Sequence, residues 1–188
     1  MKMDERKGEL ISAAKELFQT RGLTNTSIAN IADKVGVTRS LFYHYFANKQ
    51  AIVDAVIDEN VDEFMRRLEQ FELGRKAQYE DKQARVHGAL YVVRSSLVGE
   101  DSFGRHILTE KNALLRQQFC VRASKRFANK CAQMDQSSGL LEKRYGIRYP
   151  QATMYVLCIG VMSLLFQDPD VPDEVLVEAI ASVMHLDI

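Results

Sequence analysis

One short stretch near the start of the chain concentrates side chains that could do chemistry. From Arg39 to Lys49 the sequence reads RSLFYHYFANK, with four aromatic rings and a histidine between Phe42 and Phe46. The guanidinium, hydroxyl, imidazole and ammonium groups of this stretch are hydrogen-bond donors. Beside His44, no second histidine, cysteine or carboxylate stands at the spacing of a metal site. The stretch therefore predicts a surface that binds a partner.

Three short helices are expected to position these donors. The first carries one apolar stripe, ends at Gly22, and is marked by Leu10, Ala13, Ala14, Leu17 and Phe18. A second helix begins after the capping residues Thr24 to Ser27 and lasts about two turns, to Gly36. Thr38 is then expected to cap a third helix. Two helices joined by a short turn with a glycine predict a helix-turn-helix, whose second helix lies in the major groove of DNA.

The third helix is expected to have a buried side and a DNA-facing side. Phe42 and Phe46 are four residues apart and would face the small core. The outward side would then carry Arg39, Ser40, Tyr43 and His44. An arginine can donate two hydrogen bonds to guanine, and the tyrosine and histidine can donate to phosphate oxygens. Lys49 follows this helix, where a cation can meet a phosphate.

The first fifty residues resemble the TetR family of bacterial transcriptional regulators. The resemblance rests on Leu10 to Ala14, Leu17-Phe18, Gly22, Thr26 to Ile28, Ile31-Ala32, Val35 to Thr38, Phe42 to Phe46 and Lys49. It implies that Arg39 and Ser40 touch bases. It also implies that phosphates are held by Thr26, Ser27, Thr38, Tyr43 and Lys49. Leu41 and Tyr45 depart from the usual pattern, and Leu41 could contact a thymine methyl or deepen the core.

The composition predicts an all-α protein. The 188 residues are 46% hydrophobic and 27% charged, with three prolines and ten glycines, as in helical globular proteins. The net charge is zero, but the first fifty residues hold eight Lys and Arg against five Asp and Glu. A mildly basic N-terminal quarter is compatible with a nucleic-acid partner.

Several features favour a cytoplasmic protein. The N-terminus MKMDERKGE has no apolar signal core, and the longest apolar run, Met154 to Phe166, has 13 residues, fewer than a membrane span needs. Three cysteines without CxxC or zinc-like spacing indicate buried thiols in a reducing compartment: Cys120, Cys131 and Cys158. No membrane, metal or cofactor is expected.

The remaining chain predicts a larger helical domain, residues 50–188, behind a DNA-binding domain of residues 1–49. A long amphipathic helix follows Lys49, and residues 74–82 are expected to form a loop. Further helices are expected over residues 83–98, 103–134, 150–166 and, between Pro172 and Leu186, at the C-terminus.

The two C-terminal helices are expected to face apolar surroundings. The segment ATMYVLCIGVMSLLF is apolar nearly all round, with Gly160 and Ser163 allowing close approach of another helix. It could be a core helix of one subunit. The family resemblance instead implies that the last two helices pair across a two-fold axis, so that a homodimer presents two recognition helices to a palindromic site.

The family resemblance also implies an unknown small-molecule effector bound among the middle helices. Rings with polar tips are typical of ligand pockets, and the candidates are Tyr91, Arg94, Phe103, His106, Phe119 and Tyr155. A ligand that binds two conformations unequally would release the DNA.

The predicted function is therefore a ligand-responsive, homodimeric DNA-binding transcriptional regulator of the repressor type, not an enzyme. The chain has no phosphate loop, GxSxG or HExxH motif. An all-α small-molecule carrier or a protein-interaction module is the alternative. Salt separates the two classes, because binding through phosphate contacts weakens steeply as ionic strength rises.

Overall fold

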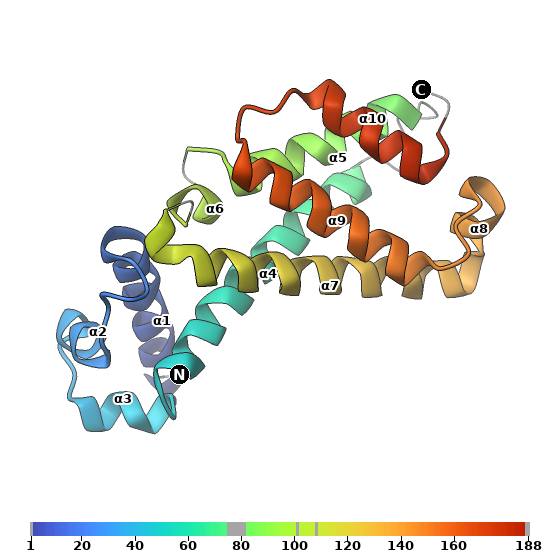
Figure 1. Cartoon of the computed structure of the whole chain (residues 1–188). Coiled ribbons are helices and arrows are strands. Elements are labelled where there is room, and N and C mark those ends of the chain that lie inside the picture. The colour runs from blue at the N-terminus through green and yellow to red at the C-terminus, as the bar shows by residue number, and fades with distance from the viewer. Residues whose placement is uncertain (1, 75–81, 101, 108, 187–188) are drawn as a thin grey trace.

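The computed structural model describes residues 2–74, 82–100, 102–107 and 109–186, and within these ranges every regular element is a helix (Figure 1). The elements are α1 (Lys2–Arg21), α2 (Ile28–Val35), α3 (Arg39–Tyr45), α4 (Lys49–Gly74), α5 (Lys82–Leu97), α6 (Phe103–His106), the 3₁₀ turn η1 (Glu110–Asn112), α7 (Ala113–Ser138), α8 (Leu140–Tyr145), α9 (Pro150–Gln167) and α10 (Asp173–Met184). The predicted all-α class, with an N-terminal helix-turn-helix and a larger helical body, is confirmed.

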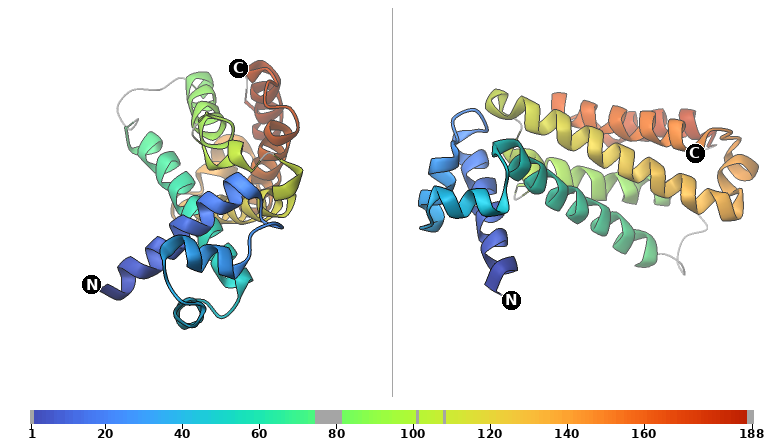
Figure 2. Two further views of the ribbon diagram at one scale, coloured as in Figure 1. Left: turned by 90° about the vertical axis from the view of Figure 1, so that its left-hand side faces the viewer. Right: turned by 90° about the horizontal axis from the view of Figure 1, so that it is seen from below.

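Helices α1 to α3 form a head at one end of the molecule, and the other helices form an elongated body (Figure 2). The large buried side chains of the head form what we call the head core, which is continuous with the apolar core of the body. Its members include Leu10, Phe18, Ile31, Phe42 and, from the first turn of α4, Ile52. Short helices such as α2 and α3 are unstable alone, so packing on this core holds them in place.

The turns of the head are locally specified. Ser27 caps α2: its hydroxyl accepts from the amide of Asn30, and the Asn30 side chain accepts from the Ser27 amide. This reciprocal pair satisfies two amides that the first turn leaves free. Gly36 has a φ of 75°, the left-handed conformation that ends α2. The predicted ends of the first two helices at Gly22 and Gly36, and the predicted cap of the third at Thr38, are confirmed.

Helix α4 joins the head to the body. Its first half buries Ile52 and Val56, and its second half buries Phe64 and Leu68. In Figure 1 the helix runs from beside α3 to beneath α5. The domain boundary predicted between residues 49 and 50 therefore falls at the first turn of a helix that extends through both parts.

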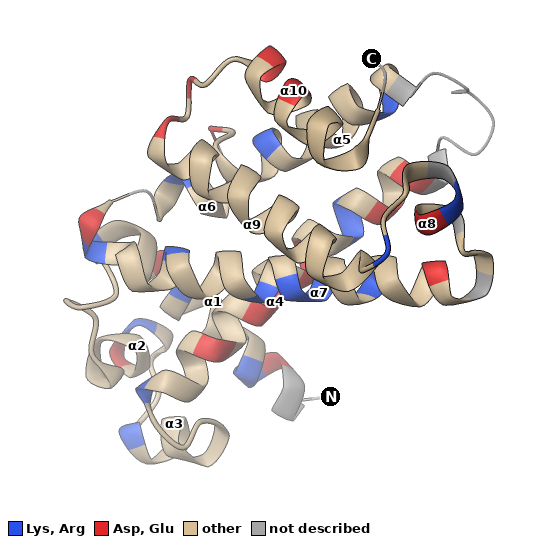
Figure 3. Cartoon of the chain, turned by 45° about the vertical axis from the view of Figure 1, so that its right-hand side comes forward, with Lys and Arg blue, Asp and Glu red and all other residues tan. Residues whose placement is uncertain are grey.

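The body is organised around α7. Helix α9 lies beside α7 and runs antiparallel to it, as both figures show. Ion pairs join α7 to α4: Arg122 with Asp54 and Asp58, Arg126 with Asp62, and Lys130 with Glu69. In Figure 3 blue positions of α7 lie beside red positions of α4, whereas α9 is tan throughout. The α4–α7 contact thus includes a row of ion pairs, whereas α9 meets α7 through uncharged side chains.

The thiols belong to this α7–α9 contact. Cys120 is buried in α7, and the sulfur of the half-buried Cys158 in α9 lies 3.8 Å from the Met162 sulfur. Burial raises the pKa of the Cys120 and Cys131 thiols to about 12 and that of Cys158 to about 11. The side chains are therefore protonated thiols at neutral pH.

The prediction of one helix over residues 103–134 is wrong. The chain forms α6, turns, and passes through η1 before α7 begins at Ala113. A Cβ at Gly104 would lie 2.1 Å from the Leu97 carbonyl oxygen, so the glycine allows α6 to approach the end of α5 closely. α8 was not predicted, although Gly139 and Gly146 bound it in left-handed conformations. Of the predicted loop at residues 74–82, residues 75–81 lie outside the described residues.

Helix α9 is more apolar than the sequence reading allowed. Its 18 residues have a mean hydropathy of 1.3, so length and composition alone would let it cross a membrane. The expectation that this segment is too short to span was wrong on this criterion. Its buried side chains, such as Met162 and Leu165, pack on the body. We therefore interpret α9 as a helix that packs against protein.

Candidate nucleic-acid interface

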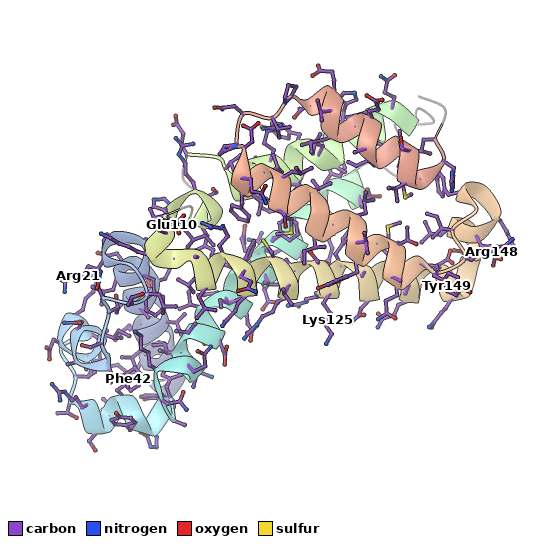
Figure 4. The ribbon with its side chains drawn as sticks, viewed as in Figure 1. Arg21, Phe42, Glu110, Lys125, Arg148 and Tyr149 are labelled. Carbon is purple, nitrogen blue, oxygen red and sulfur yellow. The ribbon has the colours of Figure 1, made fainter. Side chains whose placement is uncertain are left out.

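Helix α3 has the two sides that the spacing predicted. Phe42 is fully buried and Phe46 is 4% exposed, and both belong to the head core. Figure 4 shows Phe42 within the head. The exposed side chains of the helix include Arg39, Ser40, Tyr43 and His44. The predicted donors therefore lie on one outward surface, which we call the α3 face.

The N-terminal end of α3 is rigidly held. The Thr38 hydroxyl accepts a hydrogen bond from the Leu41 amide at 3.2 Å, which caps the helix. The ring of Tyr43 meets that of Phe42 edge to face, with centroids 5.7 Å apart, an arrangement that favours one orientation of the exposed ring. Thr38 therefore uses its hydroxyl oxygen within the protein and still has its proton to donate outward.

Leu41 and Tyr45 differ in how exposed their side chains are. Leu41 is 36% exposed, so it does not deepen the core and can contact a base methyl group. Tyr45 is half-buried against the head core, with its ring 5.2 Å from that of His44. Of the two departures from the family pattern, Leu41 alone is exposed enough to touch DNA.

Ser27 and the start of α2 form a second exposed region. The Ser27 side chain is exposed and is engaged with Asn30 in the capping pair. Helix N-termini attract phosphates, since amides and the helix dipole point toward the ligand. Backbone amides of this turn are thus the donors that the arrangement offers.

Thr26 is placed differently from the expectation. It is 1% exposed, and its hydroxyl donates to the carbonyls of Gly22 (2.9 Å) and Leu17 (3.3 Å). A buried hydroxyl that satisfies the end of α1 cannot also reach a phosphate. The side chain of Thr26 instead closes the α1–α2 turn, and its predicted phosphate contact needs correction.

Lys49 is half-buried, and its ammonium donates to the Leu23 carbonyl at 2.7 Å. Burial lowers the pKa of Lys49 below its ordinary value. The ammonium has three donors, so one holds the α1–α2 turn while the others can face outward. Lys49 thus positions the head and stays close enough to its surface for a phosphate contact.

The structure does not bring the six candidate effector residues together. Phe103 and Phe119 are buried with ring centroids 5.8 Å apart, and Phe119 also meets Phe64 at 6.2 Å. Tyr91 is 69% exposed, and His106 is exposed with its Nδ1 2.7 Å from the Ser102 carbonyl oxygen. Only Phe103 and Phe119 therefore share a place inside the body.

Arg94 and Tyr155 lie elsewhere. Arg94 binds the α9–α10 connection through the carboxylate of Asp173 at 2.7 Å and the Pro169 carbonyl oxygen at 2.7 Å. Arg94 therefore holds α10 in place. Tyr155 borders an open hollow of about 470 Å³ between α7 and α9, together with Val121, Lys125, Ala128, Asn129, Gln151 and Ala152.

Helices α9 and α10 expose apolar side chains. Val156 is 65% and Leu164 is 43% exposed on α9, and Val175 is 51% and Val183 is 40% exposed on α10. A Cβ at Gly160 would meet no atom within 4 Å. We call this surface the α9–α10 face. It has the composition of a contact with another protein rather than with water.

Comparison with known proteins identifies the head. The family model described as bacterial regulatory proteins, tetR family, matches residues 10–56. This match covers about a quarter of the chain, so the head and the first turns of α4 are similar to TetR-family regulators. FasR, a transcriptional activator of Mycolicibacterium smegmatis, is 36% identical over 67 residues, 36% of this chain and 31% of FasR. KstR2, a transcriptional repressor of Mycobacterium tuberculosis, is 38% identical over 55 residues, 29% of this chain and 28% of KstR2. These matches span less than a third of each relative.

Solved structures resemble the whole chain, body included, at the level of the fold. The structure of RolR in complex with resorcinol superposes with a TM-score of 0.69 at 20% identity, covering 99% of this chain and 90% of that of RolR. At this identity the likeness shows a shared fold. It does not show that the two proteins bind the same ligand.

One residue of the head–body contact was missed by the sequence reading. Asn112 is 1% exposed and bonds to the backbone of the head. Its position before the apolar residues Ala113 to Leu115 is typical of a helix cap, which is the signal that the sequence offers. Nothing local indicates that its side chain turns toward another part of the chain.

Proposed function

We propose that this protein is a TetR-family transcriptional regulator that binds double-stranded DNA through the α3 face. The observation that carries the proposal is the exposure of Arg39, Ser40, Tyr43 and His44 on one side of a helix whose other side is buried. Arg39 and Ser40 are assigned to bases. Ser27, Thr38, Tyr43, His44 and Lys49 are assigned to phosphates, and Thr26 to the structure of the turn.

A homodimer is the form in which we expect the protein to act. The α9–α10 face exposes apolar residues on two adjacent helices, and a second copy would bury them in a four-helix contact. The resulting two-fold symmetry would place two α3 faces on a palindromic operator, with half-sites about 34–36 Å apart or somewhat more.

A small-molecule effector is proposed to control this binding. RolR, which has the same fold, was solved in complex with resorcinol. In the present protein Phe103 and Phe119 lie together inside the body, between α4, α6 and α7. We therefore propose a small, partly aromatic effector near these rings. Resorcinol and related phenols are the first probes, and a screen that finds no compound altering operator affinity would contradict this part of the proposal.

The direction of regulation is proposed to be repression, with release by the effector. Because FasR is an activator and KstR2 a repressor, the direction needs its own test. A reporter gene driven through the operator should be expressed less in cells that contain the protein, which we expect to act in the cytoplasm.

The main test is selection of DNA sites from a random duplex pool by the purified protein at two salt concentrations. We expect a palindrome to be enriched, and its affinity to fall steeply with salt because phosphate contacts release counterions. Retention of DNA without enrichment would contradict specific recognition. Absence of DNA binding at low salt would favour the carrier or interaction-module alternative.

A further inference from the structure

The N-terminal end of α7 contains a side chain that serves the head instead of its own helix. Asn112 occupies the N-cap position of α7, yet its side chain makes no capping hydrogen bond there. Asparagine is among the best capping residues because its side-chain oxygen can accept from the first amides of a helix. Here the side chain is 1% exposed and turns away from α7.

The side-chain amide of Asn112 makes hydrogen bonds to the backbone of the head. Its Oδ1 accepts from the Leu23 amide at 2.8 Å, and its Nδ2 donates to the Phe18 carbonyl at 2.9 Å. Nδ2 also lies 3.4 Å from the His106 carbonyl oxygen. One acceptor and two donors are what a neutral carboxamide offers, and a carboxylate or hydroxyl cannot reproduce this pattern.

Two further contacts hold the same turn. Lys49, at the start of α4, donates to the Leu23 carbonyl at 2.7 Å, so both polar groups of Leu23 are bound by residues outside the turn. Gly22 has a φ of +86°, and a Cβ there would lie 2.6 Å from the Lys111 Cβ. In Figure 4 the labelled Arg21 and Glu110 mark the end of α1 and the start of η1 on either side of this junction. The turn is therefore held between η1 and α4.

From this geometry we propose that Asn112 is a positioning residue for operator binding. The turn that it binds leads directly to Ser27 and the start of α2, the second region of the DNA interface. Asn112 belongs to the body, so its hydrogen bonds fix how the head is oriented on the body. In a dimer, this orientation sets the relation between the two α3 faces. The proposal rests on the proposed DNA-binding function and adds a specific residue to it.

The test compares three variants of the full-length protein on DNA obtained from the site selection. Asn112→Asp keeps the acceptor for Leu23 but sets a carboxylate oxygen against the Phe18 carbonyl oxygen. Asn112→Ala removes both hydrogen bonds without that repulsion. Asn129→Asp is the matched control: it makes the same charge change in α7, where Asn129 accepts from Gln151 at 2.6 Å, away from the head.

The expected result distinguishes a change in the orientation of the head on the body from a loss of the folded structure of the head. For both Asn112 variants, affinity for the complete palindrome should fall roughly tenfold or more relative to Asn129→Asp. Affinity for a duplex with a single half-site should change by less than about threefold, because one head can still dock alone. An equal loss on both duplexes, or no loss on either, would overturn the proposal.

A second measurement needs no DNA. Hydrogen exchange of the Leu23 amide should be roughly tenfold faster or more in Asn112→Ala than in the unchanged protein, while amides of the head core keep their protection. Unchanged exchange at Leu23 would show that Asn112 does not hold the turn in solution, which overturns the inference. If the unchanged protein bound no DNA but showed protected Leu23, the proposed function would fail and Asn112 would remain the link between head and body.

Discussion

The head and the body of this protein differ in how completely a single chain buries their apolar side chains. In the head, Phe18, Ile31 and Phe42 are fully buried, and Ser27 and Thr38 cap α2 and α3. In the body, α9 has no charged side chain and leaves Val156 and Leu164 exposed. One chain thus buries the large apolar side chains of the small head, whereas the larger body leaves an apolar face that a second copy can bury.

The largest expected effect tests whether the head depends on its own core. Phe42→Ala should destabilise the protein by about 3–5 kcal/mol, because it empties a site with no solvent access. Denaturant unfolding measures the change. Leu41→Ala is the control on the same helix, and at 36% exposure it should cost less than about 1 kcal/mol. Similar losses for both variants would mean that the head does not have the core described.

The next effect tests whether the body needs a partner. Val156→Arg puts a charge on the α9–α10 face, which should prevent dimerisation and lower operator affinity by on the order of 100-fold through loss of bivalent binding. Sedimentation gives the oligomeric state. Gln133→Arg, on an exposed position of α7, should leave both properties unchanged. A Val156→Arg protein that remains dimeric would place the interface elsewhere.

A smaller effect separates two kinds of contact within the head. Arg39→Ala should lower operator affinity by about 1–3 kcal/mol and relax the preference at one base pair, if the guanidinium reads a guanine. Lys49→Ala should weaken binding to all sequences alike and reduce the salt dependence. Titrations with operator and scrambled DNA at several salt concentrations distinguish the two. Identical behaviour of the variants would contradict the division into base and phosphate contacts.

The smallest effect concerns the ion pairs between α4 and α7. Arg122→Gln removes the pairs with Asp54 and Asp58, whose members are partly exposed. Exposed ion pairs contribute little, so the free energy of unfolding should fall by about 0.2–1 kcal/mol, and by less at high salt. Lys125→Gln, on the exposed side of α7, is the control. A loss several times larger would mean that charge, and not apolar packing, holds α4 to the body.

The same contrast explains what could be predicted from the sequence. Helix ends in the head depend on local signals such as Gly22, Thr38 and Gly36, which the sequence displays directly. At the break between α6 and α7, Asn112 binds the head, and such contacts across the chain leave no local pattern. The α3 face followed from helical spacing, but the burial of Thr26 depends on carbonyls at the end of α1. Five of the six effector candidates have a ring, but apart from Phe103 and Phe119 they are not close in space.

The burial of the three thiols has a practical consequence for spectroscopy. Burial raises the pKa to about 12 for Cys120 and Cys131 and to about 11 for Cys158, so far less of each thiol is ionised at pH 7 than of an ordinary exposed cysteine. Alkylating reagents should therefore pass over the native thiols. A single cysteine introduced on the head surface could carry a fluorophore or spin label while the native three remain in place.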